Sequence, residues 1–168
     1  AKERLPCNVV EYTGTGSTQS ITGVGFQPDL VIIKRVDAAG DPSWFDSSRG
    51  ALKKLETADG GTGTGYQTEA TVANSLTAFG TDGFTVGSDM GASTAKYDAL
   101  CWKCNGGTTS TNTDGTITST VQVNQAAGFS IVQWTGTGTS GSVGHGLGVK
   151  PAFIIIKNRE STEHWDVW

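Results

Sequence analysis

Few side chains in this sequence are suited to acid–base chemistry. The chain has two histidines, His145 and His164, and a general base needs a partner within hydrogen-bond reach. His145 lies in the glycine-rich stretch at residues 144–148, and His164 stands beside Trp165 in a polar segment. Glycine-rich stretches are typical of turns, so we expect a turn at His145 and an exposed loop at His164. We predict no catalytic residue and no enzymatic activity.

The three cysteines include one motif, Cys101-x-x-Cys104, which can be half of a zinc site or a redox pair. A structural zinc site takes four ligands, and the sequence has no second Cys/His pair at a suitable spacing. The odd count, with Cys7 as the third, argues against a disulfide-stapled secreted scaffold. We predict no metal and no cofactor. Cys101 is then a small buried residue, and Cys104 lies where a strand leaves its sheet.

Carboxylates are the remaining groups that can do chemistry. Asp82, Asp89 and Asp114 each lie beside glycine or serine, which is typical of aspartates that form turns. A glycosidase needs two carboxyl groups about 5 to 9.5 Å apart, and no paired-carboxylate motif stands out. Calcium in an aspartate–glycine loop is an open alternative, although no known calcium-loop spacing supports it.

The elements that must position any site are strands, and they come in two similar copies. The copies span about residues 9–46 and 131–168, and each has an aromatic-ended strand, Thr-Gly-Thr-Gly, a glycine-rich bend, a proline, an apolar run and a lysine. Val9 corresponds to Ile131, an offset of 122 residues, and Pro28 to Pro151, an offset of 123. The copies therefore differ by one insertion near the bend, where we place His145 opposite Gly23.

The composition favours strands joined by tight turns. Glycine supplies 24 of the 168 residues and charged residues only 17%, which indicates many turns and few solvated helix faces. Helix formers gather only near residues 49–57, where we expect at most a short helix. The apolar runs at residues 30–33 and 152–156 are typical of central strands covered on both faces. We predict an all-β fold, an antiparallel β-sandwich of jelly-roll type.

The chain divides into two parts on this interpretation. Residues 1–126 form a first β module, made of the first copy and connector strands, and residues 127–168 begin a second copy that packs with it. Connector strands are expected at residues 84–86, 97–103 and 116–123, with a flexible glycine-rich loop at 59–65. Because the second copy stops directly after Trp165-Asp166, we expect a piece of a longer polypeptide, with its last strand completing a neighbouring sheet or left as an edge.

The charge and the lengths of the apolar stretches argue against two classes of partner. The formal net charge is −4, and no basic run goes beyond Lys53-Lys54, so phosphate backbones find no attractive surface. No apolar stretch reaches the roughly 18 to 20 residues that span a bilayer. We therefore expect neither nucleic-acid binding nor membrane insertion.

Tryptophans are the best candidates for binding. Aromatic faces pack well on apolar surfaces and carry a polar handle, but Tyr12 and Trp134 occupy equivalent positions of the repeat and are expected in the core. Trp44 and Trp165 follow the two apolar runs, so we expect them at the surface. The candidate ligand-binding residues are Trp44, His164 and Trp165.

Several motifs together resemble a known repeat domain. They are Gly23-Val24-Gly25-Phe26-Gln27-Pro28-Asp29-Leu30-Val31-Ile32-Ile33-Lys34, Asp46-Ser47-Ser48-Arg49-Gly50, Thr81-Asp82-Gly83-Phe84, Cys101-Trp102-Lys103 and Gly144-His145-Gly146-Leu147-Gly148-Val149-Lys150-Pro151. They cover nearly the whole chain and are similar to a repeat domain of long virion proteins from marine bacteriophages. The resemblance implies a tail-fibre or other virion surface location, and it supplies no catalytic mechanism. The segment Arg35-Val36-Asp37 departs from the family pattern, which usually has Asn-Arg there.

These observations predict a bacteriophage virion structural protein, a tail-fibre or surface domain that acts in host-surface glycan attachment or in virion assembly. Its expected partners are other virion subunits, with a homo-oligomer such as a trimer, and a host-surface glycan. Its expected location is the virion, outside the cell. The alternative is a carbohydrate-binding module of a cellular secreted or surface protein. A polysaccharide hydrolase is a weaker third hypothesis.

Overall fold

Strands account for nearly all regular structure in the residues that the computed structural model describes, 7–57 and 67–168. The elements in chain order are β1 (Cys7–Thr13), β2 (Gln19–Thr22), β3 (Leu30–Arg35), β4 (Ser43–Asp46), β5 (Lys53–Glu56), β6 (Ala70–Thr71), β7 (Leu76–Gly80), β8 (Gly83–Val86), the 3-10 turn η1 (Ser88–Met90), β9 (Lys96–Trp102), β10 (Ser110–Asn112), β11 (Ser119–Asn124), β12 (Phe129–Trp134), β13 (Ile155–Ile156) and β14 (Asp166–Val167). The all-β prediction is confirmed. The loop predicted at residues 59–65 lies outside the described residues.

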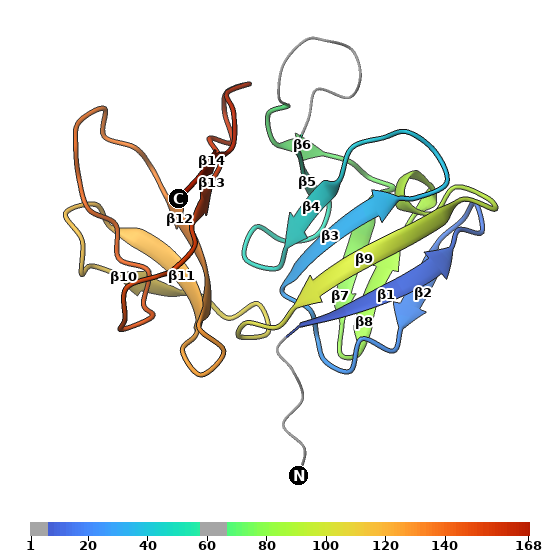
Figure 1. Cartoon of the computed structure of the whole chain (residues 1–168), viewed down its shortest axis with the longest axis horizontal. Helices are drawn as coiled ribbons and strands as arrows, with labels where there is room; N and C mark the ends of the chain where they lie inside the picture. The colour runs from blue at the N-terminus through green and yellow to red at the C-terminus, as the bar shows by residue number, and fades with distance from the viewer. Residues whose placement is uncertain (1–6, 58–66) are drawn as a thin grey trace.

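Two antiparallel sheets pack face to face in the first part of the chain (Figure 1). One has six strands in the order β1-β9-β3-β4-β5-β6, and the other has three in the order β2-β8-β7. Within the larger sheet, β9 pairs with β1 on one side and with β3 on the other. The prediction of an antiparallel β-sandwich is therefore confirmed, with the predicted connector strand β9 at its centre.

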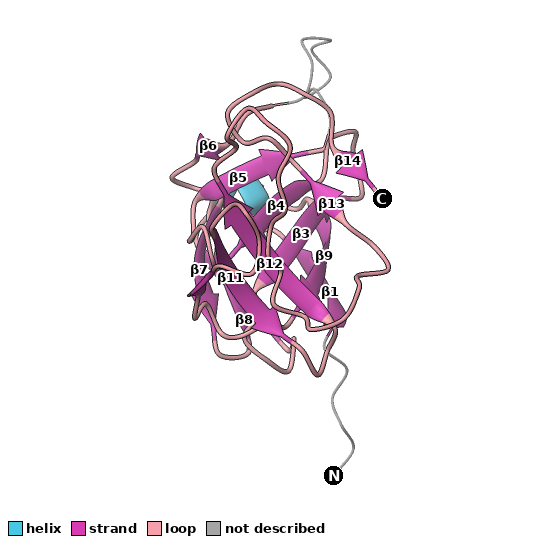
Figure 2. Ribbon diagram, turned by 90° about the vertical axis from the view of Figure 1, so that its left-hand side faces the viewer, coloured by secondary structure: helices cyan, strands magenta, loops and turns pink. Residues whose placement is uncertain are grey.

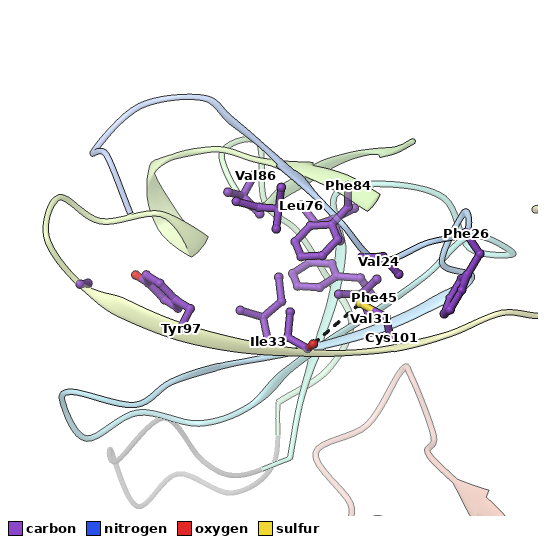
Figure 3. Close-up of a cluster of buried hydrophobic side chains, with 13 residues drawn as sticks. Val24, Phe26, Val31, Ile33, Phe45, Leu76, Phe84, Val86, Tyr97 and Cys101 are labelled. Carbon is purple, nitrogen blue, oxygen red and sulfur yellow. Dashed lines mark hydrogen bonds between the residues drawn. The ribbon is translucent and has the colours of Figure 1, made fainter. Parts of the chain in front are cut away.

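The hydrophobic core lies between these two sheets (Figure 3). Its buried members are Ile21, Val24, Phe26, Val31, Ile33, Phe45, Leu76, Phe84, Val86, Ala95, Tyr97, Ala99 and Cys101. Tyr12 packs at the edge of the core, where its ring stacks on that of Tyr97 with 5.0 Å between centroids. The expectations that Tyr12 packs against the core and that Cys101 is a small buried residue both agree with this arrangement. The same expectation for Trp134 is wrong, because Trp134 is 40% exposed.

The strand β3 is buried on one face more completely than on the other. Val31 and Ile33 point into the core and are buried, whereas Leu30 and Ile32 point to the opposite face and are half-buried. The expectation of two fully covered faces is wrong for this strand. The reason is that the second sheet packs on the core face only. The expectation is also wrong for residues 152–156, where only Ile155–Ile156 form a strand and Ile154 is 40% exposed.

Residues 49–57 form a turn and a strand instead of the short helix. Gly50 and Leu52 have φ angles of 91° and 71°, which a right-handed helix does not accept. The amide of Leu52 donates to the carbonyl oxygen of Leu76 at 2.8 Å. β5 then pairs with β4 and buries Leu55. Sheet pairing therefore overrides the local helix propensity, as tertiary contacts often do.

The second part of the chain forms two smaller sheets beside the sandwich (Figures 1 and 2). One has the order β10-β11-β12, and the other is the hairpin β13-β14. In Figure 2 the view is from this side, with β11, β12 and β13 in front of the sandwich. The hairpin β11–β12 spans the domain boundary that the sequence placed at residue 126, so the connector strands β10 and β11 share a sheet with the second copy.

The two copies of the repeat share the backbone of their Thr-Gly-Thr-Gly turn. The hydroxyl of Thr15 lies 3.2 Å from that of Ser17, and the hydroxyl of Thr137 lies 3.2 Å from that of Thr139. Each Thr-Gly-Thr-Gly turn also has its last glycine in the left-handed region, with φ of 79° at Gly16 and 74° at Gly138. Chain segments 122 residues apart thus form the same turn.

The backbone also locates the insertion that separates the copies. Gly23 and Gly25 have φ of 90° and 88°, and the matching left-handed pair is Gly146 and Gly148, both at 74°. The offset is therefore already 123 at Gly146, so the extra residue lies before it. His145 accordingly stands opposite Thr22, which corrects the alignment of His145 with Gly23.

Candidate functional site

Trp44 and Trp165 lie against one another, although they are far apart in the sequence. Their ring centroids are 4.8 Å apart at an interplanar angle of 41°. Trp44 lies on β4 beside Ile32 of β3, and Trp165 precedes β14. The indole nitrogen of Trp165 donates to the carbonyl oxygen of Glu56 at 2.9 Å. Two of the three predicted binding residues therefore join the second copy to the sandwich.

Ion pairs reinforce this junction between the copies. The buried guanidinium of Arg49 pairs with Asp46 and, at 3.0 Å, with Glu69. Arg159 of the second copy approaches the same Glu69 carboxylate at 3.3 Å, and its carbonyl oxygen accepts from the Glu69 amide at 2.8 Å. Glu69 thus pairs with Arg49, which follows the first copy and donates to the Trp44 carbonyl oxygen, and with Arg159 of the second copy.

His164, the third predicted residue, is exposed on the loop before β14. It adjoins Trp165 in the chain. The indole nitrogen of Trp44 is buried and has no acceptor among the described residues. The three residues therefore offer one exposed imidazole beside a half-buried aromatic pair.

The strand register shows that Trp44 and Trp165 are not equivalent residues of the repeat. Ile32 faces Trp44 across β3 and β4, and the matching Ile155 faces Val167 across β13 and β14. The counterpart of Trp44 is therefore Val167. By the same offset of 123 residues, the counterpart of Phe45 is Trp168.

The hairpin β13–β14 presents apolar side chains to solvent. We call this set the hairpin surface; its members are Phe153, Ile154, Ile155, Val167 and Trp168. Ile154 is 40% exposed, whereas its counterpart Val31 is 0% exposed. Trp168 is 77% exposed, whereas its counterpart Phe45 is 0% exposed. Positions that form the core of the first copy are thus open in the second.

A buried carboxylate that the sequence analysis missed anchors the chain as it leaves the sandwich. Asp29 is fully buried. It accepts hydrogen bonds from the Ser47 hydroxyl at 2.6 Å and from the amides of Cys104, Gly106 and Gly107 at 2.6, 3.0 and 2.8 Å. Hydrogen bonds to a carboxylate are about twice as strong as neutral ones. Asp29 therefore fixes the segment that leads from β9 to the second copy.

Gln122 on β11 completes this network. Its side chain is fully buried, and its carbonyl oxygen accepts from the amides of Asn105 and Gly107 at 3.1 and 2.9 Å. Its amide nitrogen donates to the hydroxyl of Ser48 at 2.7 Å. A signal for this network was present in the repeat, since Asp29 corresponds to Ala152. A polar residue that only one copy carries points to a contact that only that copy makes.

A family model described as Domain of unknown function (DUF7483) matches residues 7–168. The chain belongs to this family. No curated protein matches the chain, and no solved structure matches it. The DUF7483 match includes both copies of the repeat, so the sandwich, the junction and the hairpin surface all lie within one family unit.

Possible metal ligands are not gathered in the described part of the DUF7483 chain. It contains no cluster of three histidine, cysteine, aspartate or glutamate side chains that could hold a metal ion. A groove of about 500 Å³ is lined in part by Asp114, Gln125, His145 and Lys150. There the Nδ1 atom of His145 accepts from the Leu147 amide at 3.1 Å, which is the turn role expected of this residue.

The two motif cysteines of the DUF7483 chain are buried. Burial raises the pKa of Cys101 to about 12, and burial together with the charge of Asp29 raises that of Cys104 to about 12. A raised pKa keeps a thiol protonated and therefore weakly nucleophilic. In the described residues, no helix has the length and apolar character needed to cross a membrane.

Proposed function

We propose that this chain is a non-catalytic structural module of a bacteriophage virion, in a tail fibre or another surface protein, and that it associates with other virion subunits. The observation that carries the proposal is the exposure of the hairpin surface. The virion context draws its support from the motifs that resemble phage virion repeats.

The physical argument starts from the size of the exposed side chains. Ile154 is 40% exposed and Trp168 is 77% exposed, and these two residues face each other across the hairpin, where their backbones exchange hydrogen bonds. Burial of apolar surface contributes about 25 cal/mol per Å², so leaving these side chains in water is unfavourable. Contiguous exposed apolar side chains on a folded domain mark interaction surfaces. Packing against a further protein segment is the process that removes them from water, and here we propose a segment of another subunit.

Light scattering across a range of concentrations tests this proposal. The chain should form oligomers whose mass rises with concentration, and Ile154→Asp or Trp168→Asp should shift it towards the monomer, because a charge in an apolar contact is costly. Val36→Asp is the matched control, since Val36 is 50% exposed but lies outside the hairpin surface. A parent chain that stays monomeric at every concentration, with all variants unchanged, would overturn self-association through this surface.

Glycan attachment is the second candidate, whether in a virion or in a cellular carbohydrate-binding module. The observation that favours it is the half-buried pair of Trp44 and Trp165, next to the exposed His164. Aromatic rings supply apolar contact and an N–H donor together. A glycan array should then show a ligand whose binding is lost in Trp165→Ala and retained in Trp134→Ala. Absence of any bound glycan would remove this candidate.

A further inference from the structure

We infer that the hydroxyl of Ser47 and the side-chain carboxamide of Gln122 form an ester bond with each other, with loss of ammonia. Ser47 lies in the turn after β4, and Gln122 lies on β11. The bond joins the sandwich to the sheet β10-β11-β12. Both residues lie outside the hairpin surface, so the bond is independent of the association proposed above.

The two reacting groups are already in contact. The Oγ atom of Ser47 lies 3.0 Å from Nε2 of Gln122 and 3.4 Å from its Oε1. Nε2 also donates to the Ser48 hydroxyl at 2.7 Å, but Ser47 is the serine that lies close to both ends of the carboxamide. Amide hydrogens lie in the plane of the carboxamide, so this group must turn about its Cγ–Cδ bond before its carbon faces Ser47. The torsion about that bond is only broadly restricted.

A buried carboxylate is positioned to activate the serine. The Ser47 hydroxyl donates to Oδ1 of Asp29 at 2.6 Å, and a base acts on a nucleophile at about 2.6 to 3.2 Å. The other oxygen of Asp29 accepts from the amides of Cys104 and Gly106 at 2.6 and 3.0 Å, which keeps Oδ1 oriented towards the hydroxyl. Serine is a weak nucleophile until a base takes its proton. Asp29 is the base for this proton.

Two backbone amides meet the oxygen of the carboxamide. Oε1 of Gln122 accepts from the amides of Asn105 and Gly107 at 3.1 and 2.9 Å. Donors about 2.7 to 3.1 Å from such an oxygen stabilise the negative charge that develops when a nucleophile adds to the carbon. Both donors belong to one turn, in which the amide of Thr108 donates to the carbonyl oxygen of Asn105. Nucleophile, base and oxyanion donors therefore converge on one carboxamide.

The reaction balances within the chain. The Oγ atom of Ser47 bonds to Cδ of Gln122 as its proton passes to Asp29, and Oε1 takes the negative charge between the two amides. The carbonyl re-forms as the bond between Cδ and Nε2 breaks, and the proton on Asp29 passes to the leaving nitrogen. The products are one ester and one ammonia molecule, and the carboxylate is regenerated.

Burial favours the ester over its hydrolysis. Gln122 and Asp29 are both 0% exposed, and exclusion of water prevents hydrolysis of reactive groups. A competing nucleophile is the thiol of Cys104, whose Sγ donates to the main-chain oxygen of Gln122 at 3.1 Å. Its raised pKa keeps this thiol protonated, and a protonated thiol is a poor nucleophile. Ser47 is therefore the favoured partner of Gln122.

Mass spectrometry of the purified whole chain tests the bond. The chain should weigh less than its sequence by one ammonia molecule, and proteolysis should give one branched fragment that contains Ser47 and Gln122. Ser47→Ala should restore the full mass. Ser48→Ala is the matched control and should keep the loss. Ser47→Thr retains the hydroxyl and should also keep the loss, which separates the chemistry of the hydroxyl from the folding of the turn.

The role of Asp29 is tested by the rate at which the bond forms. Asp29→Asn has nearly the same shape as the carboxylate but is no base, so the loss of ammonia should appear about a hundredfold more slowly, as expected when a general base is removed. The mass of freshly purified chain is followed over time. A rate equal to that of the parent would show that Asp29 does not take the proton.

A denaturing gel gives a second readout. Ser47 and Gln122 are 75 residues apart, and a cross-link of that span restricts the unfolded chain. The parent chain should therefore migrate faster than Ser47→Ala after denaturation. Mild alkali opens an ester and should abolish the difference.

Asn105 requires its own control, because an asparagine before glycine loses ammonia when it forms a succinimide with the next backbone amide. Asn105→Ala removes that route and retains the backbone N–H that bonds to Gln122, so the mass loss should persist. Alkaline hydrolysis in water enriched in heavy oxygen should place the label on the side chain of residue 122.

Three outcomes would overturn the inference. The first is full mass in a parent chain whose Cys101 is protected from alkylation, because that chain is folded and carries no bond. The second is a loss that persists in Ser47→Ala and disappears in Cys104→Ala, which would identify a thioester. The third is a loss that maps to Asn105. Each of these outcomes leaves the association through the hairpin surface untouched.

Discussion

The two copies of the repeat have the same turns and the same hairpin register but different surroundings. In the first copy, strands that follow the repeat, β7, β8 and β9, close the core around β3 and β4. In the second copy the matching hairpin, β13–β14, has solvent on its apolar side chains. The repeat therefore encodes a local conformation, whereas burial depends on strands outside it. Pairs of equivalent residues can separate these two contributions.

The largest contrast is expected between Phe45 and Trp168, which occupy the same repeat position. Phe45→Ala should lower the free energy of unfolding by about 3 to 5 kcal/mol, the usual cost of removing a buried aromatic ring. Trp168→Ala should change it by less than about 0.5 kcal/mol, because the ring is exposed. Chemical denaturation measures both. Similar losses in the two variants would mean that the second copy has a core of its own.

Asp29 and Ala152 provide the next contrast. Asp29→Ala leaves the buried amides of Gly106 and Gly107 without their carboxylate acceptor, and unsatisfied buried groups cost about 1 to 3 kcal/mol each. We expect a loss of about 2 to 4 kcal/mol on that basis. Ala152→Asp is the reciprocal control; Ala152 is exposed, so little change is expected in thermal unfolding. A neutral Asp29→Ala variant would contradict the anchoring role.

Gly14 and Gly136 occupy the same place in the two Thr-Gly-Thr-Gly turns. A Cβ atom on Gly14 would lie 2.2 Å from the carbonyl oxygen of Ala92, whereas one on Gly136 would meet nothing within 4 Å. Gly14→Ala should therefore cost about 1 to 3 kcal/mol through overpacking, and Gly136→Ala should be nearly neutral. Equal effects on denaturation midpoints would show that the turn itself, and not its packing, requires glycine.

The contact between the copies should show a smaller coupling. In a double-mutant cycle, Trp44→Ala and Trp165→Ala should couple by about 0.5 to 1.5 kcal/mol, the range found for aromatic pairs. The cycle of Trp44→Ala with Trp134→Ala is the control and should be additive within about 0.5 kcal/mol. Additivity in the first cycle as well would mean that the tryptophan contact does not hold the copies together.

The smallest effect concerns the thiols of Cys7 and Cys101, whose reactivity depends on whether the larger sheet of the sandwich stays closed. Cys7 is exposed, and Cys101 on β9 is buried with its pKa raised to about 12 from an ordinary value of 9.0. The thiol of Cys101 therefore stays protonated to a higher pH in the folded state than in the unfolded state. Stability from this group is complete below pH 9 and is lost as the pH rises towards 12. Alkylation near pH 8 should modify Cys7 quickly and Cys101 only on unfolding; fast modification of Cys101 would mean that β9 opens readily.

Local pattern was enough to predict much of the sandwich. The apolar runs and the turn-forming glycines predicted β1, β3, β8, β9 and β11, because these signals lie within a few residues of the strands that they specify. The repeat likewise predicted that residues 131–134 form a strand. The strand β5 was missed because its conformation depends on pairing with β4 and on the bond from Leu52 to Leu76.

The candidate site was less predictable, because its contacts join distant segments. The sequence singled out Trp44 and Trp165, but it could not show that their rings touch each other. Asp29 was noted only as part of a motif. Its role as a buried acceptor could not be predicted, because its partners Cys104, Gly106 and Gly107 lie more than seventy residues away in the sequence. The solvent exposure of the hairpin surface could not be predicted either, because a run of apolar residues has the same sequence pattern whether or not a strand covers it.

The position of β9 in the chain has a consequence for synthesis on the ribosome. The hairpin β3–β4 is complete at Asp46, but β9 begins only at Lys96. As the chain emerges from its N-terminus, the first hairpin is made well before the strand that closes it, and long-range pairing of this kind forms slowly. During that interval the first copy has the same unclosed edge that β13 has among the described residues. The nascent protein is therefore most open to wrong strand partners between these two points of elongation.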